Sequence, residues 1–461
     1  ARTRMTTRAS RMSARPTMRA RSRVDGRARR RCVARGTRRD EDGTPTRVCV
    51  VGGGFAGASL AFHVIEEANA RGRAIDVTLV DAVGVAGGAS GVAAGLLHPY
   101  TPRGKTVWRG DEGVREAKRM IDAAQRAEEG LDVTGVERCD DADGGWRDSV
   151  GRNTGERRRE RVANAPGIVR PARSAKQGRD FKRHVEADDA FARCLTTEET
   201  MAMCPGLAFT EDVLEEERKG DEGCAGALYI PNGVIVDAPR YLSALWDASV
   251  VLASRGAAGT RARLRISKVE RVEDLFEEFD QVALCCGAAV ASLFDYEKIP
   301  IQLQGGHVLE LKPKEGLDVG ILGTTYVAPL GTARAMVGPT KEYDAAPEDC
   351  FRAGVVDDDV DPRAADALAQ LRELGVKAYP PTADWDVLRV KYGVRGNPPR
   401  TPLGALPLAG SARIDDETSA WFLAGLGARG LVYHGILGRW MANAILDDDV
   451  SRIPEDVRRV C

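Results

Sequence analysis

The sequence has no run of about 18 apolar residues, so nothing in it predicts a membrane-spanning helix. Its ten cysteines include no C-x-x-C pair, and its five histidines belong to no cluster with metal-ligand spacing. A G-x-S-x-G elbow and a P-loop are also absent. These absences argue against a structural zinc site, a serine hydrolase of the elbow type and a P-loop nucleotidase, and no metal is expected.

Acidic residues are scarce in the first 40 positions, which hold about 15 arginines against Asp25 and Asp40. The chain has a formal net charge of −1, so this surplus of roughly +13 leaves the remainder roughly 14 charges negative. An arginine-rich, acid-poor segment with serine and threonine is typical of an organellar transit peptide; a disordered basic arm that binds nucleic acid is the alternative. We leave residues 1–45 out of the fold prediction and expect an organelle, chloroplast in preference to mitochondrion.

The first glycine-rich motif follows an apolar strand in residues 47–57, which break into G-x-G-x-x-G. Gly52 permits a tight turn, Gly54 lets the backbone approach a pyrophosphate, and Gly57 lets the next helix pack close to the strand. Strand, glycines and helix in this register predict a dinucleotide site.

The segment after the glycines completes that pattern. A helix is expected at 55–71, with the backbone N–H groups of its first turn, at Phe55 and Ala56, facing the pyrophosphate. A second apolar strand at 75–80 ends on Asp81, an acid that we expect to accept hydrogen bonds from a ribose hydroxyl.

The 461 residues are long enough for two domains. Strands alternating with helices predict an α/β fold in which a Rossmann-like, doubly wound domain is assembled from the discontinuous segments 47–135, 225–300 and 385–461. Middle strands with longer connections predict a second domain, with a mixed or antiparallel sheet, from 136–224 and 301–384. The elements expected elsewhere include helices at 111–130, 195–218, 241–255 and 361–374, strands at 227–230, 234–236, 264–272 and 281–285, and irregular chain at 139–183.

Six separated blocks in the body of the chain carry a family resemblance. They are 52–57 with Asp81, 87–91 leading to Gly95, 280–288, 326–329 followed by 338–340, 393–395 with 401, 402 and 407, and 425–431. In this order they resemble the flavin amine oxidases of the D-amino-acid oxidase type. That family includes glycine oxidase, sarcosine oxidase and the oxidoreductase half of the bifunctional enzyme that makes methylaminomethyl-thiouridine in tRNA, to which the chain is most similar.

The resemblance implies FAD as the cofactor. No cysteine stands where some members attach their flavin, so we expect non-covalent FAD. Besides the fingerprint residues, the positions that match the family's cofactor contacts are Ala89, Ser90, Gly91, Gly95, Val269, Gly287, Gly427, Ala428, Gly430 and Leu431. For Val269, an ordinary buried valine in a strand is the alternative.

Three residues are predicted to be catalytic, Arg395 and Tyr326 towards the substrate and Arg429 towards the flavin. Arg395 matches the family's carboxylate-binding arginine by its Gly-Val-Arg context, with a surface salt bridge as the alternative. Arg429, at a helix N-terminus, is expected to stabilise negative charge on the reduced flavin, with a solvent-facing role as the alternative. Tyr326 either donates a hydrogen bond to the substrate carboxylate or packs in the second sheet. His98 either faces the flavin or caps a loop.

The resemblance implies oxidation of an amine that bears a carboxymethyl group, with oxygen as the expected electron acceptor. The first hypothesis is carboxymethylaminomethyl-uridine in organellar tRNA, and the second is a free amino acid or N-methyl amino acid. A flavin-bound assembly factor without turnover is the third. The basic stretch 152–183 is either a tRNA phosphate footprint or a solvated loop.

Overall fold

The computed structural model describes residues 44–134, 161–185, 192–220, 225–294, 297–352, 354–356, 363–416 and 418–461. Apart from its last two residues, the segment predicted as a transit peptide or basic arm lies outside them, as do residues 152–160 of the basic stretch. In the described part of the chain, no helix is long and apolar enough to cross a membrane.

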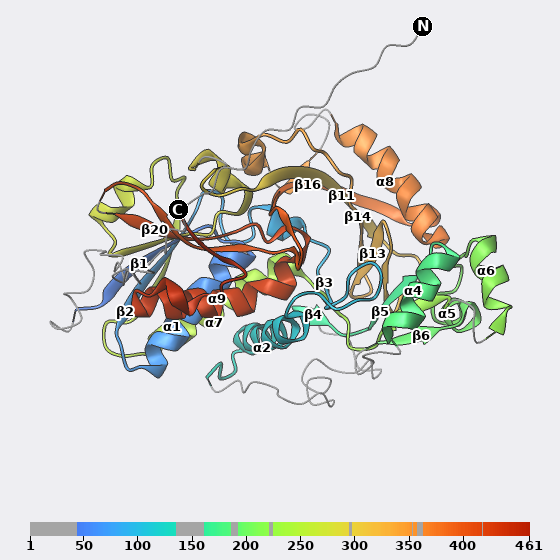
Figure 1. Ribbon diagram of the computed structural model, residues 1–461, viewed down its shortest axis with the longest axis horizontal. Coiled ribbons are helices and arrows are strands. Elements are labelled where there is room, and N and C mark those ends of the chain that lie inside the picture. The colour runs from blue at the N-terminus through green and yellow to red at the C-terminus, as the bar shows by residue number, and fades with distance from the viewer. Residues whose placement is uncertain are drawn as a thin grey trace, which may run out of the picture. The chain divides into compact units, whose positions relative to one another are not determined.

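The first sheet has seven strands in the order β21-β19-β20-β10-β1-β2-β9 (Figure 1). The five strands from β20 to β9 run parallel, whereas β19 runs antiparallel to β20. Their bounds are β1 Thr46–Val51, β2 Ile75–Asp81, β9 Arg261–Ile266, β10 Gln281–Leu284, β19 Leu408–Arg413, β20 Ser419–Ala424 and β21 Arg458–Val460. The parallel order confirms the predicted Rossmann-like sheet.

Strand β1 is covered on both faces, which explains its continuous apolar run. Val48 and Val50 pack into the core beneath the helices, whereas Cys49 and Val51 pack into a second core on the opposite face. Helix α1 packs against α7 and α9, and α2 packs against the same two helices. These helices span α1 Phe55–Ala70, α2 Gly110–Glu128, α7 Ala238–Ser254 and α9 Gly430–Asp447.

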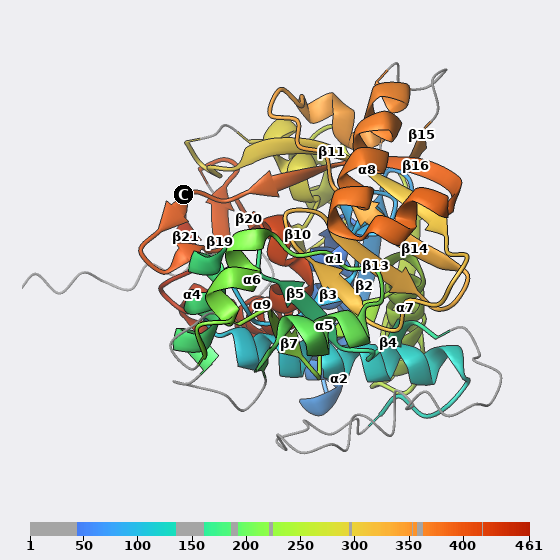
Figure 2. The same ribbon diagram turned by 90° about the vertical axis from the view of Figure 1, so that its right-hand side faces the viewer.

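The second sheet has nine strands in the order β15-β16-β11-β14-β13-β12-β5-β7-β6 (Figures 1 and 2). All neighbours run antiparallel except β5 and β12. The bounds are β5 Ile168–Pro171, β6 Arg193–Leu195, β7 Ala227–Ile230, β11 Gln302–Lys312, β12 Gly320–Leu322, β13 Tyr326–Leu330, β14 Arg334–Gly338, β15 Gly354–Val356 and β16 Asp386–Asn397. This mixed sheet confirms the second part of the predicted fold class, while the domain boundaries stay a prediction.

Smaller elements surround the two sheets. Helix α8 packs on β11, β13, β14 and β16 (Figure 2), and α4 and α5 lie beside β6 (Figure 1). The bounds are α4 Ala175–Val185, α5 Thr197–Met203, α6 Glu211–Glu217, α8 Ala364–Ala378, β3 Leu96–Leu97, β4 Ala163–Asn164, β8 Val234–Val236, β17 Arg400–Thr401 and β18 Gly404–Ala405.

Three sequence predictions were wrong. The described part of 139–183 is not irregular, because it contains β4, β5 and α4; a short buried strand between charged segments gives little periodic signal. The helix predicted at 195–218 is two short helices, interrupted at Pro205 and Gly206. The strand predicted at 264–272 ends at Ile266, which leaves Val269 in the following loop.

Candidate functional site

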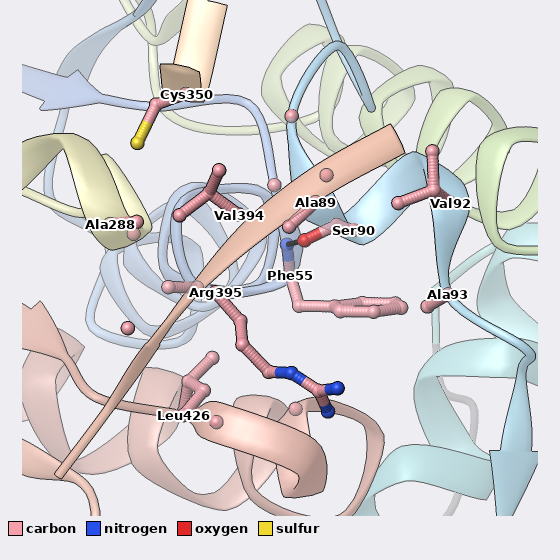
Figure 3. A pocket seen from close by; sticks show the side chains of 18 of the residues that line it. Phe55, Ala89, Ser90, Val92, Ala93, Ala288, Cys350, Val394, Arg395 and Leu426 are labelled. Carbon is pink, nitrogen blue, oxygen red and sulfur yellow. Dashed lines mark hydrogen bonds between the residues drawn. The ribbon is translucent and has the colours of Figure 1, made fainter. Parts of the chain in front are cut away.

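The carboxyl ends of the parallel strands open into a cavity of about 580 Å³ (Figure 3). Open α/β sheets bind ligands at this edge. The first sheet and its helices contribute the glycine loops on one side, and β11, β13, β5 and β16 of the second sheet contribute side chains on the other. Every predicted site residue except Gly57 and Gly91 lines this cavity.

The fingerprint glycines stand where a side chain does not fit. Gly52 has φ +110°, and a Cβ built on it would lie 2.5 Å from the carbonyl oxygen of Cys285. A Cβ on Gly57 would lie 1.8 Å from the carbonyl oxygen of Gly52. The close packing of α1 on the β1 turn therefore depends on glycine at both positions.

The first turn of α1 carries free donors. Gly54, the N-cap residue, has no side chain to cap the helix, and among the described residues the only side-chain partner of this turn is Ser90, whose Oγ accepts the backbone N–H of Phe55 at 3.1 Å (Figure 3). A helix start leaves several N–H groups without intrahelical partners, and together with the helix dipole they favour an anion. The turn, with Ala56 on the cavity wall, fits a diphosphate.

Asp81 holds the loop that follows β2. Its Oδ2 accepts the N–H of Gly53 at 2.6 Å, and its Oδ1 accepts those of Val83 and Gly84 at 2.9 Å each. A carboxylate oxygen can accept two hydrogen bonds, and Oδ2 of Asp81 accepts one here. Asp81 therefore retains capacity for a ribose hydroxyl. The sequence motif did not reveal that this carboxylate also fixes the fingerprint turn.

The second glycine loop passes beneath β16. A Cβ on Gly393 would lie 2.5 Å from Cγ2 of Val92 and 3.2 Å from Cα of Ala89. Gly95 has φ +75°, and a Cβ there would lie 1.9 Å from the carbonyl oxygen of Val236. Glycine thus lets this loop run between the two sheets. Gly91, just beyond the cavity wall, has no room for a Cβ because the Ala86 carbonyl oxygen would lie 2.0 Å away.

The start of α9 closes the cavity against the start of α1. A Cβ on Gly430 would lie 3.1 Å from Cδ2 of Phe55. Gly287 and Gly427 have φ values of +59° and +51° at turns on the wall. Ala428, Leu431 and Val269 complete this part of the lining. The N-termini of α1 and α9 and the turns at Gly52, Gly95, Gly287 and Gly427 therefore meet around one space. This arrangement fits a dinucleotide.

Arg395 extends from β16 into the cavity (Figure 3). It makes no hydrogen bond or ion pair within the part of the chain that the structure describes. Burial lowers the pKa of its guanidinium, although a guanidinium remains charged at neutral pH. Burial also raises the pKa of the nearby Tyr326 hydroxyl, which therefore stays a neutral donor. The surface salt bridge considered for Arg395 is absent from the described residues.

Arg429 lies at the junction of Gly427–Arg429 and α9. Its Nη2 donates to the carbonyl oxygen of Tyr100 at 2.9 Å, and burial lowers its pKa. Arg429 is partly buried on the cavity wall, and its role beside the flavin stays a prediction.

Sequence reasoning missed Arg170 as a cavity residue. Arg170 lies on β5 and is 4% exposed, and burial lowers its pKa to about 10. His98 lies close to it, and its Nδ1 accepts the N–H of Tyr100 at 3.1 Å. Burial, with Arg429 and Arg170 nearby, lowers the pKa of His98 well below its usual value, so the ring is neutral. His98 thus caps the loop at Tyr100, one of the two roles considered from the sequence, and it also lines the cavity. In the sequence, the only feature that drew attention to Arg170 was its place in the basic stretch 152–183.

The parallel sheet, the glycine turns and the cations facing them define a dinucleotide-dependent oxidoreductase. A family model described as FAD dependent oxidoreductase, abbreviated DAO, matches residues 47–444. The chain therefore belongs to this family, and the predicted activity class and FAD cofactor are confirmed. The glycine cradle and the open N-terminus of α1 fit that cofactor.

The fold also matches solved structures. Glycine oxidase from Geobacillus kaustophilus is 18% identical, with a TM-score of 0.61 over 88% of this chain and 95% of that chain. Iminodiacetate oxidase from Chelativorans sp. BNC1 is 17% identical, with a TM-score of 0.59 over 90% of this chain and 99% of that chain. L-proline dehydrogenase from P. horikoshii is 14% identical, with a TM-score of 0.58 over 88% of this chain and 94% of that chain. No curated protein sequence matches significantly.

Proposed function

We propose that this protein oxidises a small amine that bears a carboxymethyl group. The observation that carries the proposal is Arg395, a half-buried guanidinium without an acidic partner among the described residues, which projects into the FAD-type cavity beside Tyr326. A planar guanidinium binds a carboxylate with two parallel hydrogen bonds, and burial strengthens that pairing. The solved structures with this fold include oxidases of glycine and iminodiacetate, which are such amines.

The side chains have separate tasks in this proposal. Arg395 binds the carboxylate and Tyr326 donates to it, which fixes the carbon between the carboxylate and the amine. The chemistry that bound FAD would supply here is acceptance of the hydride from this carbon, with oxygen as the proposed final electron acceptor. Arg429 and the N-terminus of α9 stabilise negative charge that develops beside them. A base is not required, because a fraction of the amine is neutral at mildly alkaline pH.

A tRNA substrate remains the more specific hypothesis, and the described residues give it less support. Two basic side chains of α4 already have acidic partners: Arg179 contacts Glu216 at 2.7 Å, and Arg183 contacts Asp180 at 3.1 Å. Arg170 of the same stretch is buried in the cavity and is out of reach of an RNA backbone. We therefore favour a free amine and keep tRNA as an arm of the test. An organellar location also stays a proposal.

Anaerobic mixing of the FAD-loaded protein with candidate substrates tests this function. Sarcosine, glycine, iminodiacetate and tRNA carrying carboxymethylaminomethyl-uridine are each added, and loss of the oxidised flavin absorbance is followed. We expect bleaching by at least one small amine and none by the tRNA. Bleaching by the tRNA alone would establish the tRNA hypothesis instead, and no bleaching by any arm would contradict the proposed substrate class.

A further inference from the structure

Arg170 is a buried cation to which the proposed reaction assigns no task. It is 4% exposed, and its guanidinium makes no hydrogen bond or ion pair within the described residues. Its Nε is fully buried without a partner. A buried charge without a compensating group is unfavourable, so such a residue is retained where a ligand supplies the opposite charge.

The register of the second sheet places Arg170 beside the proposed carboxylate site. Tyr326 of β13 pairs with Leu322 of β12, and Ile321 pairs in parallel with Val169 of β5. Arg170 therefore lies in register with Leu322, and residues in register point to the same face of a sheet. Tyr326 and Arg170 thus share a face two strands apart, roughly 10 Å between their backbones. Both line the cavity, as does Leu322 between them.

Arg395 belongs to the same face. It pairs with Gln304 of β11, and Val308, four residues further along β11, lines the cavity. Because side chains alternate along a strand, an even separation keeps these positions on one face. The face of the second sheet that points into the cavity therefore presents Arg395 near one end and Arg170 at the other, with Tyr326 between them.

Among the described residues, no carboxylate of the cavity lining neutralises this end. Asp81 is the single acidic residue among the described residues that line it, and its oxygens accept three N–H groups of the fingerprint loop. The neighbours of Arg170 add positive charge or none: Arg429 lies near enough to disfavour the protonated state of Arg170, and His98 is neutral. The glycine turns that fit FAD come from the first sheet and its helices, so the anion that Arg170 faces belongs to the substrate side.

We propose that Arg170, together with Arg429, binds a second carboxylate of the substrate. The preferred substrates are then iminodicarboxylates, in which the amine joins two carboxyl-bearing carbons, with one carboxylate at Arg395 and Tyr326 and the other at Arg170. This inference rests on the proposed function, because it takes the Arg395 end of the cavity as the first carboxylate site.

Two thioethers that an amine oxidase does not oxidise form a matched pair of probes. Methylthioacetate, here the thioether CH3–S–CH2–COO⁻, carries one carboxylate. Thiodiglycolate carries a carboxymethyl group on each side of the sulfur and so has two carboxylates. Their Kd values are measured on the FAD-loaded protein by calorimetry and by perturbation of the flavin absorbance. We expect the wild-type protein to bind thiodiglycolate at least about tenfold more tightly than methylthioacetate, since one buried charge-assisted pair is worth that much or more.

Variants separate this inference from the proposed function. Arg170→Leu removes the preference for thiodiglycolate and leaves the Kd of methylthioacetate within about twofold, whereas Arg395→Leu weakens both probes by about tenfold or more. Arg173→Leu, at an exposed position three residues away, retains the wild-type values. Should Arg170→Leu fail to fold, Arg170→Lys keeps the charge without the planar fork and is expected to retain part of the preference.

Equal binding of the two probes by the wild-type protein would overturn the second site, as would an Arg170 variant that weakens both probes equally. Normal binding of both probes by Arg395→Leu would instead refute the first carboxylate site, and with it the proposed function. The two failures are therefore distinguishable by which arginine affects which probe.

Discussion

The hydroxyl oxygen of Ser90 accepts the backbone N–H of Phe55 at 3.1 Å, and this contact joins the second glycine loop to the first turn of α1. Helices begin more stably where a side-chain oxygen satisfies an N–H of the first turn. Replacing Ser90 with alanine removes that acceptor. We expect the free energy of unfolding of the FAD-free protein to fall by about 1 kcal/mol in urea titrations. An unchanged unfolding midpoint would show that the contact contributes nothing.

Gly57 lies where α1 crosses the turn after β1, and alanine there would place Cβ against the Gly52 carbonyl oxygen. We expect Gly57→Ala to lose FAD binding or to fail to fold, because the overlap is with a backbone atom and can be relieved only by shifting the turn or the helix. Gly88, which lines the cavity, provides a control, since its Cβ would meet nothing within 4 Å and its φ is −99°. FAD content after gel filtration measures both, and retention of FAD by Gly57→Ala would contradict the predicted packing.

His434 is buried at the second turn of α9 in a neutral form. Its Nδ1 donates to the carbonyl oxygen of Leu431 at 3.0 Å, and its Nε2 accepts from the Tyr241 hydroxyl at 2.7 Å. Burial lowers the pKa of His434 to about 4. The unfolded chain therefore binds a proton near pH 6.5 that the folded protein does not bind until about pH 4.

Stability is accordingly expected to fall as pH decreases from 6.5 towards 4, by roughly 1.4 kcal/mol per pH unit from this residue. His98, also buried and neutral, acts in the same direction. Urea unfolding at several pH values measures the slope, and His434→Met, which has no titrating group, reduces it. A slope that is identical in wild type and variant would contradict this assignment.

The FAD is expected to be non-covalent. Three cysteines line the described part of the cavity wall, and burial raises the pKa of the Cys285, Cys286 and Cys350 thiols, which keeps them protonated and poorly nucleophilic. Acid precipitation of the purified protein should therefore release its flavin into the supernatant. Flavin absorbance that remains with the pellet after denaturation would contradict this expectation.

The dinucleotide side of the site was readable from the sequence because its geometry depends on local rules. Gly52, Gly54 and Gly57 follow from one strand-turn-helix unit, and the alternation of strands and helices predicted the parallel sheet around it. The later glycine blocks entered through the family resemblance. Their meeting at one cavity depends on long-range pairing, as between β20 and β10, that no local pattern encodes.

The substrate side was less readable for the same reason. Arg170 lies in a four-residue strand, and only its pairing through β12 brings it into line with Tyr326. From the sequence, its charge counted as one of many in a basic stretch. The loop position of Val269 and the backbone contacts of Asp81 likewise depend on where neighbouring strands end.

The central claim is that Arg395 binds the substrate carboxylate while FAD stands beside it. The most direct measurement is the anaerobic rate of flavin reduction by iminodiacetate or sarcosine in wild type, Arg395→Leu and Arg400→Leu, the last at an exposed position on β17. We predict that Arg395→Leu retains FAD and lowers the second-order rate by about 100-fold or more, whereas Arg400→Leu changes it less than about twofold. Equal rates in wild type and Arg395→Leu would contradict the account.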